Sequence, residues 1–376
     1  MKGYLDTPYF PQDPVDPKYF VGRDEVIKTF KDAFQSVLKG RAANAAIYGE
    51  RGMGKTSLLM KLKTLPPSGC FVVYCPLSDK SDQKAFVDAL LQKIDLDYRE
   101  SLPIHKFLIE KVKEIPEKIE SFNVFDLSLS LRKGEMDPYR ALLESLLKLR
   151  KRGFKGAYIL IDEADLLTTE ALALIRNSIQ EIRSIYRFPV GIIAAGKQRL
   201  TKRLGGKWSP LSRFFALMEQ ELKPLNEKEV FEALTVPHVA WTKDAAKLVF
   251  DRSNGYPTVV QLYGATCYLR RNSTTITKEL VQKIDAEVKE ELWQWFQNGW
   301  KDSPSDLEAK CIAVVAKNGG SATYSQVEKA LKKIPAMPLR RAVEKHILSQ
   351  DERGTYSVPH KLIAELFLEN TRNNST

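Results

Sequence analysis

Four short apolar runs alternate with helical patterns in the first part of the chain, at residues 45–48, 70–75, 157–162 and 190–195, and a fifth short strand is expected near residues 220–222. Uninterrupted apolar runs of this length are typical of strands buried on both faces, as in a parallel sheet that is covered by helices. Amphipathic helical segments lie between the runs, and the first extends from Asp24 to about Val37. The pattern therefore predicts an α/β fold built on a parallel sheet.

The segment between the second and third runs is long and contains a different pattern. After two helical stretches, apolar and polar residues alternate in the order Phe125, Asp126, Leu127, Ser128, Leu129, Ser130, Leu131. Alternation with a period of two is typical of a strand with one buried face. We therefore expect a half-buried strand or hairpin in this segment.

Beyond Asn226 the pattern is helical as far as about Val288, which predicts a small lid-like bundle. A dense group of aromatic residues follows between Leu292 and Trp300, and such a group more often packs two domains together than stacks on bases. Residues 305–370 then show three helices, a strand pair and a last helix. This order is the outline of a winged helix-turn-helix domain.

The first run leads directly into a sequence motif that carries chemistry. The stretch from Gly49 to Ser57 fits the pattern G-x-x-x-x-G-K-[ST] without a mismatch, and a helical stretch follows it. Such a loop points backbone N–H groups at phosphate oxygens, and the helix N-terminus adds partial positive charge. Lys55 is suited to reach the β- and γ-phosphates, and the Thr56 hydroxyl is suited to hold Mg²⁺. The residues expected to bind nucleotide here are Gly49, Glu50, Arg51, Gly52, Met53, Gly54, Lys55, Thr56 and Ser57.

The third apolar run ends in two carboxylates, Asp162 and Glu163. Ligands of open parallel sheets bind at the carboxyl ends of the strands, where this pair is expected to lie. Asp162 is suited to hold Mg²⁺ through a water, and Glu163 to act as the general base toward the attacking water. The competing interpretation is an acidic strand end or a helix N-cap. Together the two motifs predict an ATP- or GTP-binding protein that acts as a hydrolase.

Composition excludes some other classes of protein. The chain has 376 residues, of which 43% are apolar and 28% charged, as is ordinary for a globular protein of two or three domains. It lacks an apolar run of the roughly 20 residues that span a bilayer, and its N-terminus has no apolar signal segment. Four cysteines without a C-x-x-C pair argue against zinc or a disulfide framework. We therefore expect a cytoplasmic protein without a membrane partner.

The net charge of +11 is distributed unevenly. Six cations and no acidic residue lie between Lys197 and Arg213, and a second basic run extends from Lys148 to Lys155. Clusters of this kind can contact a nucleic-acid backbone. They also occur on surfaces for solubility alone, so charge leaves both interpretations open.

These motifs, in this order, resemble the AAA+ superfamily of P-loop NTPases (ASCE type), in the branch that joins origin-recognition-like ATPases to the STAND signalling ATPases. Phe20 to Glu25 is similar to the entry motif that lies over the adenine, which implies nucleotide contacts from Val21, Gly22 and Arg23. The segment from Ser209 to Phe215 looks like the box that carries an arginine finger, which implies a catalytic role for Arg213. Ser253 to Pro257 matches a lid motif whose proline touches the base, here Pro257.

Two positions depart from the pattern of that superfamily. A polar residue usually closes the fourth strand, but this chain has Ala194-Ala195-Gly196-Lys197. Lys197 or Gln198 could substitute, and slow hydrolysis is expected. The lid arginine of the initiators is absent near Thr258, which cannot replace its charge. Arg213 also has a second interpretation, as a surface cation or a nucleic-acid contact.

The resemblance implies a division of the chain into four parts. The prolines at positions 8, 11, 14 and 17 favour an extended N-terminal arm over residues 1–19, because proline cannot propagate a helix. We expect a P-loop AAA+ core over residues 20–224, a helical lid over residues 225–300 and a winged-helix domain over residues 301–376.

Two functions are compatible with these features. The first is an ATPase that uses ATP and Mg²⁺, binds double-stranded DNA and assembles with nucleotide, as a homo-oligomer or with a partner protein. The second is a STAND-like switch that acts through protein partners and has a structural winged helix. The third helix of the winged-helix domain separates them, because Arg340, Arg341 and Lys345 are expected on its exposed side. Leu339, Val343 and Ile347 are expected to face the core, and Arg353 to lie in the wing.

Overall fold

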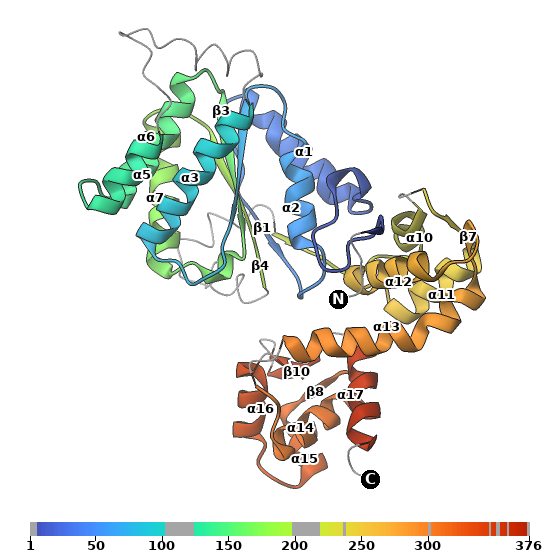
Figure 1. Cartoon of the computed structure of the whole chain (residues 1–376). Helices are drawn as coiled ribbons and strands as arrows, with labels where there is room; N and C mark the ends of the chain where they lie inside the picture. The colour runs from blue at the N-terminus through green and yellow to red at the C-terminus, as the bar shows by residue number, and fades with distance from the viewer. Residues whose placement is uncertain are drawn as a thin grey trace. The chain divides into compact units, whose positions relative to one another are not determined.

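The structure is a computed structural model that describes residues 6–101, 124–197, 219–235, 238–299, 302–345, 347–350, 354–358 and 361–373. The chain forms two compact units. The core unit consists of Asp16–Glu50 and Gly54–Lys223, and the C-terminal unit of Met1–Val15, Arg51–Met53 and Pro224–Thr376. Figure 1 colours both units along the chain. Each unit is described separately.

The core unit is built on a parallel sheet of five strands in the order β2-β3-β4-β1-β5. Its strands are β1 (Ala45–Tyr48), β2 (Cys70–Pro76), β3 (Gly156–Asp162), β4 (Val190–Gly196) and β5 (Glu219–Glu221). All residues of β3 and β4 are buried, as expected for central strands that are covered on both faces. The prediction of an α/β fold with these strands is confirmed. Because the strands are parallel, their carboxyl ends share one edge of the sheet, where β1 leads into the glycine-rich loop.

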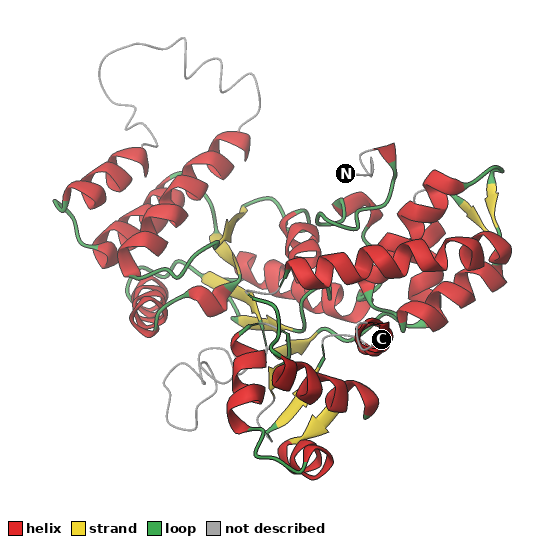
Figure 2. Ribbon diagram, turned by 60° about the horizontal axis from the view of Figure 1, so that its bottom comes forward, coloured by secondary structure: helices red, strands yellow, loops and turns green. Residues whose placement is uncertain are grey.

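Helices cover both faces of this sheet (Figure 2). In the core unit, α1 (Asp24–Leu38) and α2 (Lys55–Lys63) lie on one face. The other face carries α3 (Gln83–Ser101), α5 (Val124–Lys133), α6 (Pro138–Lys151) and α7 (Thr169–Ser184). Alternate side chains of β3 lie on opposite faces of the sheet. Tyr158 packs edge-on against Phe34 of α1. Ile159 belongs to the apolar core under α3 and α5–α7. A short helix, η2 (Pro17–Tyr19), precedes α1.

The prediction of a strand or hairpin at residues 125–131 is wrong, because Val124–Lys133 is the helix α5. Leu127, Ser128 and Leu131 are buried together, as residues one helical turn apart should be, whereas Leu129 is exposed. The alternating pattern places the serines on the polar face of a strand. Ser128 is instead a small buried residue whose hydroxyl donates to Asp88 Oδ1 at 2.5 Å.

The C-terminal unit begins with four helices: α10 (Glu227–Thr235), α11 (Lys243–Ser253), α12 (Pro257–Arg270) and α13 (Lys278–Asn298). A parallel pair of two-residue strands, β6 (Ala240–Trp241) and β7 (Thr275–Ile276), interrupts the helical pattern that the sequence predicted. The N-terminal segment is anchored in this bundle by Tyr9, which is buried. Its hydroxyl donates to the Leu234 carbonyl at 2.6 Å and accepts from Trp241 Nε1 at 2.8 Å.

The last part of this unit has the winged helix-turn-helix order: α14 (Asp306–Lys317), β8 (Ser321–Thr323), α15 (Tyr324–Leu331), α16 (Ala336–Glu344), β9 (Ser349–Gln350), β10 (Thr355–Ser357) and α17 (Lys361–Asn373). The three strands form an antiparallel sheet in the order β8-β10-β9. The aromatic group on α13 packs against this part, because Trp293 lies 6.0 Å from Phe367 of α17 between ring centroids. Within the described residues, none of the helices has the length and apolar character needed to cross a membrane.

Candidate nucleotide-binding site

Lys55 begins α2 directly after the glycine-rich loop. The turn into the helix is made by Gly54, whose φ of 81° lies in the left-handed region that favours glycine. Lys55 Nζ donates to the carbonyls of Gly49 at 2.9 Å and Glu50 at 3.0 Å, so the ammonium group lies under the start of the loop. Burial lowers the pKa of Lys55, and the nearby carboxylates, Glu163 first among them, oppose that shift. A buried cation in this loop is suited to receive an anionic ligand.

Asp162 ends β3 and lies beside the start of α2. Its Oδ2 accepts the Thr56 hydroxyl at 2.7 Å and the Tyr74 hydroxyl at 3.0 Å, and its Oδ1 accepts the Glu163 N–H at 3.0 Å. Burial, and then the Asp162 charge, raise the pKa of Tyr74, so the phenol keeps its proton. The structure therefore brings together the Thr56 and Asp162 that the sequence predicted as a metal pair. It adds Tyr74, which the sequence analysis missed.

The donor chemistry of Thr56 and Asp162 fits Mg²⁺. A hydroxyl and a carboxylate supply hard oxygen ligands, and Mg²⁺ usually needs only one or two protein ligands besides waters and phosphate oxygens. Among the described residues there is no group of three or more His, Cys, Asp or Glu side chains that could hold a metal ion by itself. The site therefore suits a metal that arrives with a phosphate ligand rather than a closed protein cage.

Glu163 adopts an uncommon backbone conformation. Its φ of 52° and ψ of 40° are left-handed, and it precedes the short helix η3 (Ala164–Leu166). A left-handed non-glycine residue stores strain of about 1–3 kcal/mol and is frequent at functional sites. The conformation turns the chain sharply after β3, and the Glu163 side chain is half-buried at the edge of the sheet.

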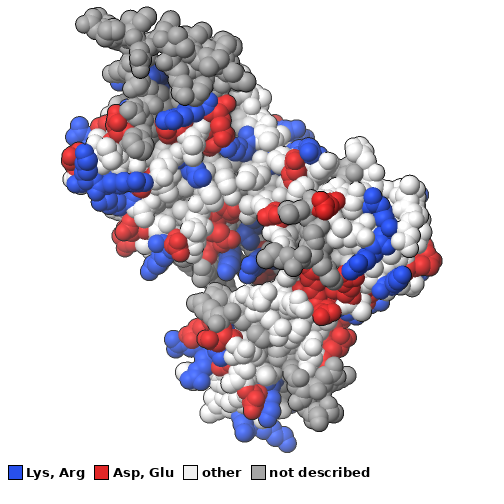
Figure 3. All heavy atoms as spheres, viewed as in Figure 1, with Lys and Arg blue, Asp and Glu red and all other residues white. Residues whose placement is uncertain are grey.

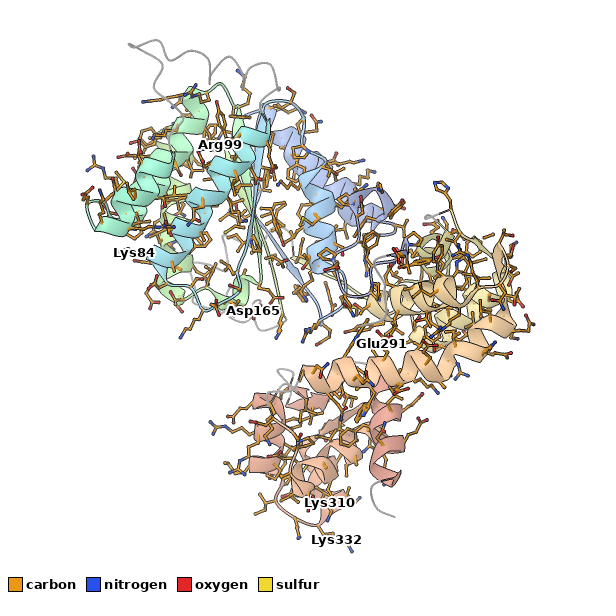
Figure 4. The ribbon with its side chains drawn as sticks, in the orientation of Figure 1. Lys84, Arg99, Asp165, Glu291, Lys310 and Lys332 are labelled. Atoms are coloured by element: carbon orange, nitrogen blue, oxygen red, sulfur yellow. The ribbon has the colours of Figure 1, made fainter. Side chains whose placement is uncertain are left out.

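Asp165 is a second acidic residue at this edge that the sequence analysis did not select. It is buried, and its Oδ1 accepts the Lys197 N–H at 3.1 Å just after the end of β4. Figure 4 labels Asp165 near the carboxyl ends of the strands. This chain lacks the polar residue that closes the fourth strand in the superfamily pattern, and η3 brings the polar side chain of Asp165 to that strand end. A carboxylate three residues beyond Asp162, on a short turn, was the signal in the sequence.

The other predicted nucleotide contacts lie in several places. Val21, Gly22 and Arg23 directly precede α1, and the Arg23 guanidinium donates to the Lys223 carbonyl after β5. Pro257 is the first residue of α12, in the C-terminal unit. Arg213 and Gln198 lie outside the described residues. The nucleotide roles of these residues stay predictions.

The tip of the loop, Arg51–Met53, belongs to the C-terminal unit together with the lid helices. Within that unit the Tyr256 hydroxyl donates to the Arg51 carbonyl, and the Thr258 hydroxyl donates to the Gly52 carbonyl at 3.0 Å. Gly52 has a φ of 86°, and a Cβ there would come within 2.7 Å of Thr258 Oγ1. Thr258, near the position where initiators have an arginine, is thus a neutral hydrogen-bonding partner of the loop backbone.

The cations predicted to contact DNA differ in their surroundings. Arg340 and Arg341 of α16 are exposed, and Leu339 and Ala342 are buried beneath them. Lys345 does not share the expected exposed face. Its Nζ donates to Glu308 Oε2 at 2.8 Å and to the Ser303 carbonyl at 2.9 Å, and only 21% of its side chain is exposed.

Glu308 is the reason for this difference, because its carboxylate is only 2% exposed and needs a cation. One further correction concerns α16. Val343 is only half-buried, and the core position is taken by Ala342. Arg353 lies outside the described residues. Figure 3 shows Lys and Arg side chains on the surface of the winged-helix part, where Lys332, Lys333, Arg340 and Arg341 are exposed.

Comparison with known proteins agrees with this geometry. Residues 19–193 match the AAA ATPase domain family. An uncharacterized HTH-type transcriptional regulator of Methanocaldococcus jannaschii is 23% identical over 360 residues, which cover 87% of this chain and 82% of the relative.

Two solved structures have a similar fold over almost their whole length. The Walker-type ATPase of Pyrococcus abyssi is 17% identical, with a TM-score of 0.59. The match covers 93% of this chain and 96% of that chain. The ORC2 protein of Aeropyrum pernix is 13% identical, with a TM-score of 0.59. The match covers 99% of this chain and 98% of that chain. The resemblance expected from the motifs is confirmed: residues 19–193 match the AAA ATPase domain family, in a chain whose fold is similar to that of the Aeropyrum pernix ORC2 protein.

Proposed function

We propose that this protein binds ATP with Mg²⁺ at the loop between β1 and α2 and hydrolyses it. The observation that carries the proposal is the 2.7 Å hydrogen bond between Thr56 and Asp162, which joins two motifs 106 residues apart in the sequence. The ORC2 protein of the same fold was solved in ADPNP and ADP complexes, which makes adenine nucleotides the ligands to test first.

Each residue of the site has its own proposed role in phosphoryl transfer. Lys55 supplies a buried positive charge for the β- and γ-phosphates, and the glycine-rich loop supplies backbone N–H groups. Bound Mg²⁺, held by Thr56 and Asp162, would neutralise phosphate charge. Glu163, fixed at the strained turn after β3, is suited to accept a proton from water. Arg213 could add a positive charge from a neighbouring copy, which would make turnover depend on assembly.

We further propose that the winged-helix part binds the backbone of double-stranded DNA. Support comes from the exposed Arg340 and Arg341 on α16 and from Lys332 and Lys333 on the turn before it. The helix is positioned by buried Leu339 and Ala342, so its cations are held on one surface. The HTH-type regulator of similar sequence has a name that fits this role.

A salt titration of duplex DNA binding, with and without Mg-ATP, tests this proposal. The slope of log K against log salt should fall by roughly 0.9 for each lost phosphate contact. Arg340→Ala with Arg341→Ala should therefore weaken binding and flatten the slope by about 1.8. Lys243→Ala with Lys283→Ala removes the same charge from exposed lid positions and is the matched control. An equal effect of both pairs, or no effect of either, would contradict a DNA contact by α16.

A protein-partner switch is the second candidate, and one observation favours it. Ile334, on the turn before α16, and Met337, in its first turn, are 76% and 54% exposed. Large exposed apolar side chains are more typical of a protein contact than of a surface that tracks phosphates. If α16 serves a protein partner, Ile334→Ser with Met337→Ser should abolish that contact and leave the salt dependence of DNA binding unchanged.

A further inference from the structure

Tyr74 lies on the edge strand of the core sheet, one strand away from the acidic motif. It pairs with Leu160 of β3, and Pro76, two residues further along β2, pairs with Asp162. Tyr74 and Asp162 are therefore diagonal neighbours, close enough for a long side chain to reach across. The Tyr74 side chain spans this distance, because its hydroxyl donates a hydrogen bond to Asp162 Oδ2 at 3.0 Å.

The hydrogen bonds on Asp162 restrict both of its oxygens. Oδ2 accepts the hydroxyls of Thr56 and Tyr74, and Oδ1 accepts the backbone N–H of Glu163. Because Thr56 gives its single proton to Asp162, its oxygen lone pairs remain directed elsewhere and can accept a cation. The Tyr74 hydroxyl donates a second hydrogen bond to the same carboxylate oxygen, and so adds a restraint from β2 to the one that Thr56 supplies from α2.

The backbone of Tyr74 is held in turn. Among the described strands β2 is at the edge of the sheet, with β3 as its one neighbour. The Tyr74 N–H donates to Asp97 Oδ2 on α3 at 3.2 Å. Asp97 also forms an ion pair with Lys63 Nζ at 2.7 Å, and its side chain is only 10% exposed. Lys63 is the last residue of α2, whose second residue is Thr56. One network of contacts therefore fixes Tyr74 relative to the helix that carries the predicted metal ligand.

We propose that Tyr74 is a positioning residue that orients the Asp162 carboxylate toward the Mg²⁺ of the bound nucleotide. This inference rests on the proposed nucleotide site. Groups that hydrogen-bond a metal-ligating carboxylate orient it, and their removal typically costs 10–100-fold in metal affinity. Tyr74 acts through Asp162 alone, so nucleotide binding in the absence of Mg²⁺ is expected not to depend on it.

The test is a Mg²⁺ titration of fluorescent ADP binding to the full chain. Tyr74→Phe should raise the Mg²⁺ concentration at the midpoint by about 10-fold or more, and should leave ADP affinity in EDTA unchanged. Tyr158→Phe is the matched control, because Tyr158 lies in the same sheet on β3. Its hydroxyl contacts the Ala43 N–H at 3.1 Å and the Ala33 carbonyl at 3.3 Å rather than the acidic motif. This control should keep the wild-type midpoint.

The possible outcomes separate the two proposals. A Tyr74→Phe midpoint equal to that of wild type, in a protein that binds ADP normally, would overturn the role of Tyr74 and leave the nucleotide site intact. No Mg²⁺-dependent ADP binding by wild type would overturn the nucleotide site, and with it this inference. Equal midpoint shifts in Tyr74→Phe and Tyr158→Phe would show a general effect of losing a hydroxyl, and would also contradict the positioning role. Melting temperatures in EDTA check that both variants fold.

Discussion

The acidic edge of the core sheet and the cationic face of α16 are both predicted to meet phosphate ligands, but they are built differently. Asp162 accepts hydrogen bonds from groups on α2, β2 and the turn after β3. Arg340 is 72% exposed and pairs only with Glu344 on the same helix among the contacts described for its side chain. An exposed pair of this kind contributes about 0.3–0.5 kcal/mol. The first site is fixed by the fold before a ligand arrives, whereas the second can reorient its cations toward a partner.

The largest expected effect comes from removing the base of the fixed site. Glu163→Gln keeps the size and hydrogen bonding of the side chain but cannot accept a proton. Turnover of ATP, measured as phosphate release, should fall by roughly 10²–10⁴ while nucleotide binding persists. Turnover at the wild-type rate would mean that the acidic pair is only the end of a strand.

Lys345 should behave as a structural residue, unlike its neighbours on α16. Lys345→Met leaves the buried Glu308 carboxylate without its cation, which should cost about 3 kcal/mol in stability. Hydrogen exchange would detect the loss as faster exchange of α14 amides, with α2 and β3 unchanged. If the variant instead keeps wild-type protection and flattens the salt dependence of DNA binding, Lys345 is a phosphate contact after all.

The same ion pair predicts a dependence on pH. Burial alone raises the pKa of Glu308, but hydrogen bonds from Lys345 and the Ser305 N–H outweigh it and hold that pKa below its usual value. A carboxyl with a depressed pKa stabilises the fold above its unfolded pKa of about 4.3, and that contribution is lost as the pH falls through the folded pKa. The stability gap between wild type and Lys345→Met should therefore narrow as the pH falls through about 4.3 and then through the lower folded pKa of Glu308. A gap that stays constant would mean that Glu308 does not carry it.

Much of the core could be predicted from the sequence, because four of its five strands contain an apolar run and its loop is a contiguous motif. Lys55, Thr56 and Asp162 lie where those patterns place them. Tyr74 and Asp165 could not be selected, because their contacts with Asp162 and Lys197 depend on strand register and on the turn after β3. Sequence patterns report which face of an element is buried, but not which side chains from different elements meet.

Two of the errors, at residues 125–131 and at Lys345, have the same kind of cause. Ser128 is a polar residue, but it is small enough to be buried beside Leu127 and Leu131. The alternation of apolar and polar residues therefore predicts a strand, whereas the segment is a helix. Lys345 lies on a face that the helical period makes exposed, but Glu308 of α14, 37 residues earlier, lies against it. In both cases a hydrogen bond to a residue of another helix draws a polar side chain away from the exposed surface that the sequence pattern predicts for it.

The smallest expected effects concern the lid contact with the loop tip. Thr258→Val removes the hydroxyl that donates to the Gly52 carbonyl but keeps the shape of the side chain. The loss of one neutral hydrogen bond should weaken ADP binding by about 1 kcal/mol, or roughly fivefold. Equilibrium ADP binding would measure this change, and Thr266→Val on the same helix α12 is the control. A loss of a hundredfold or more would indicate that Thr258 contacts the nucleotide itself.

The central claim is that the loop from Gly49 to Ser57 binds nucleotide through Lys55. Its most direct test compares the unfolding free energy of wild type and Lys55→Ala, with and without Mg-ATP. At a ligand concentration a hundredfold above Kd, wild type should gain about 2.7 kcal/mol, because ligand binds only the folded state. The Lys55→Ala protein should unfold like wild type without ligand and gain almost nothing with it. No gain in wild type, or an equal gain in both proteins, would contradict the claim.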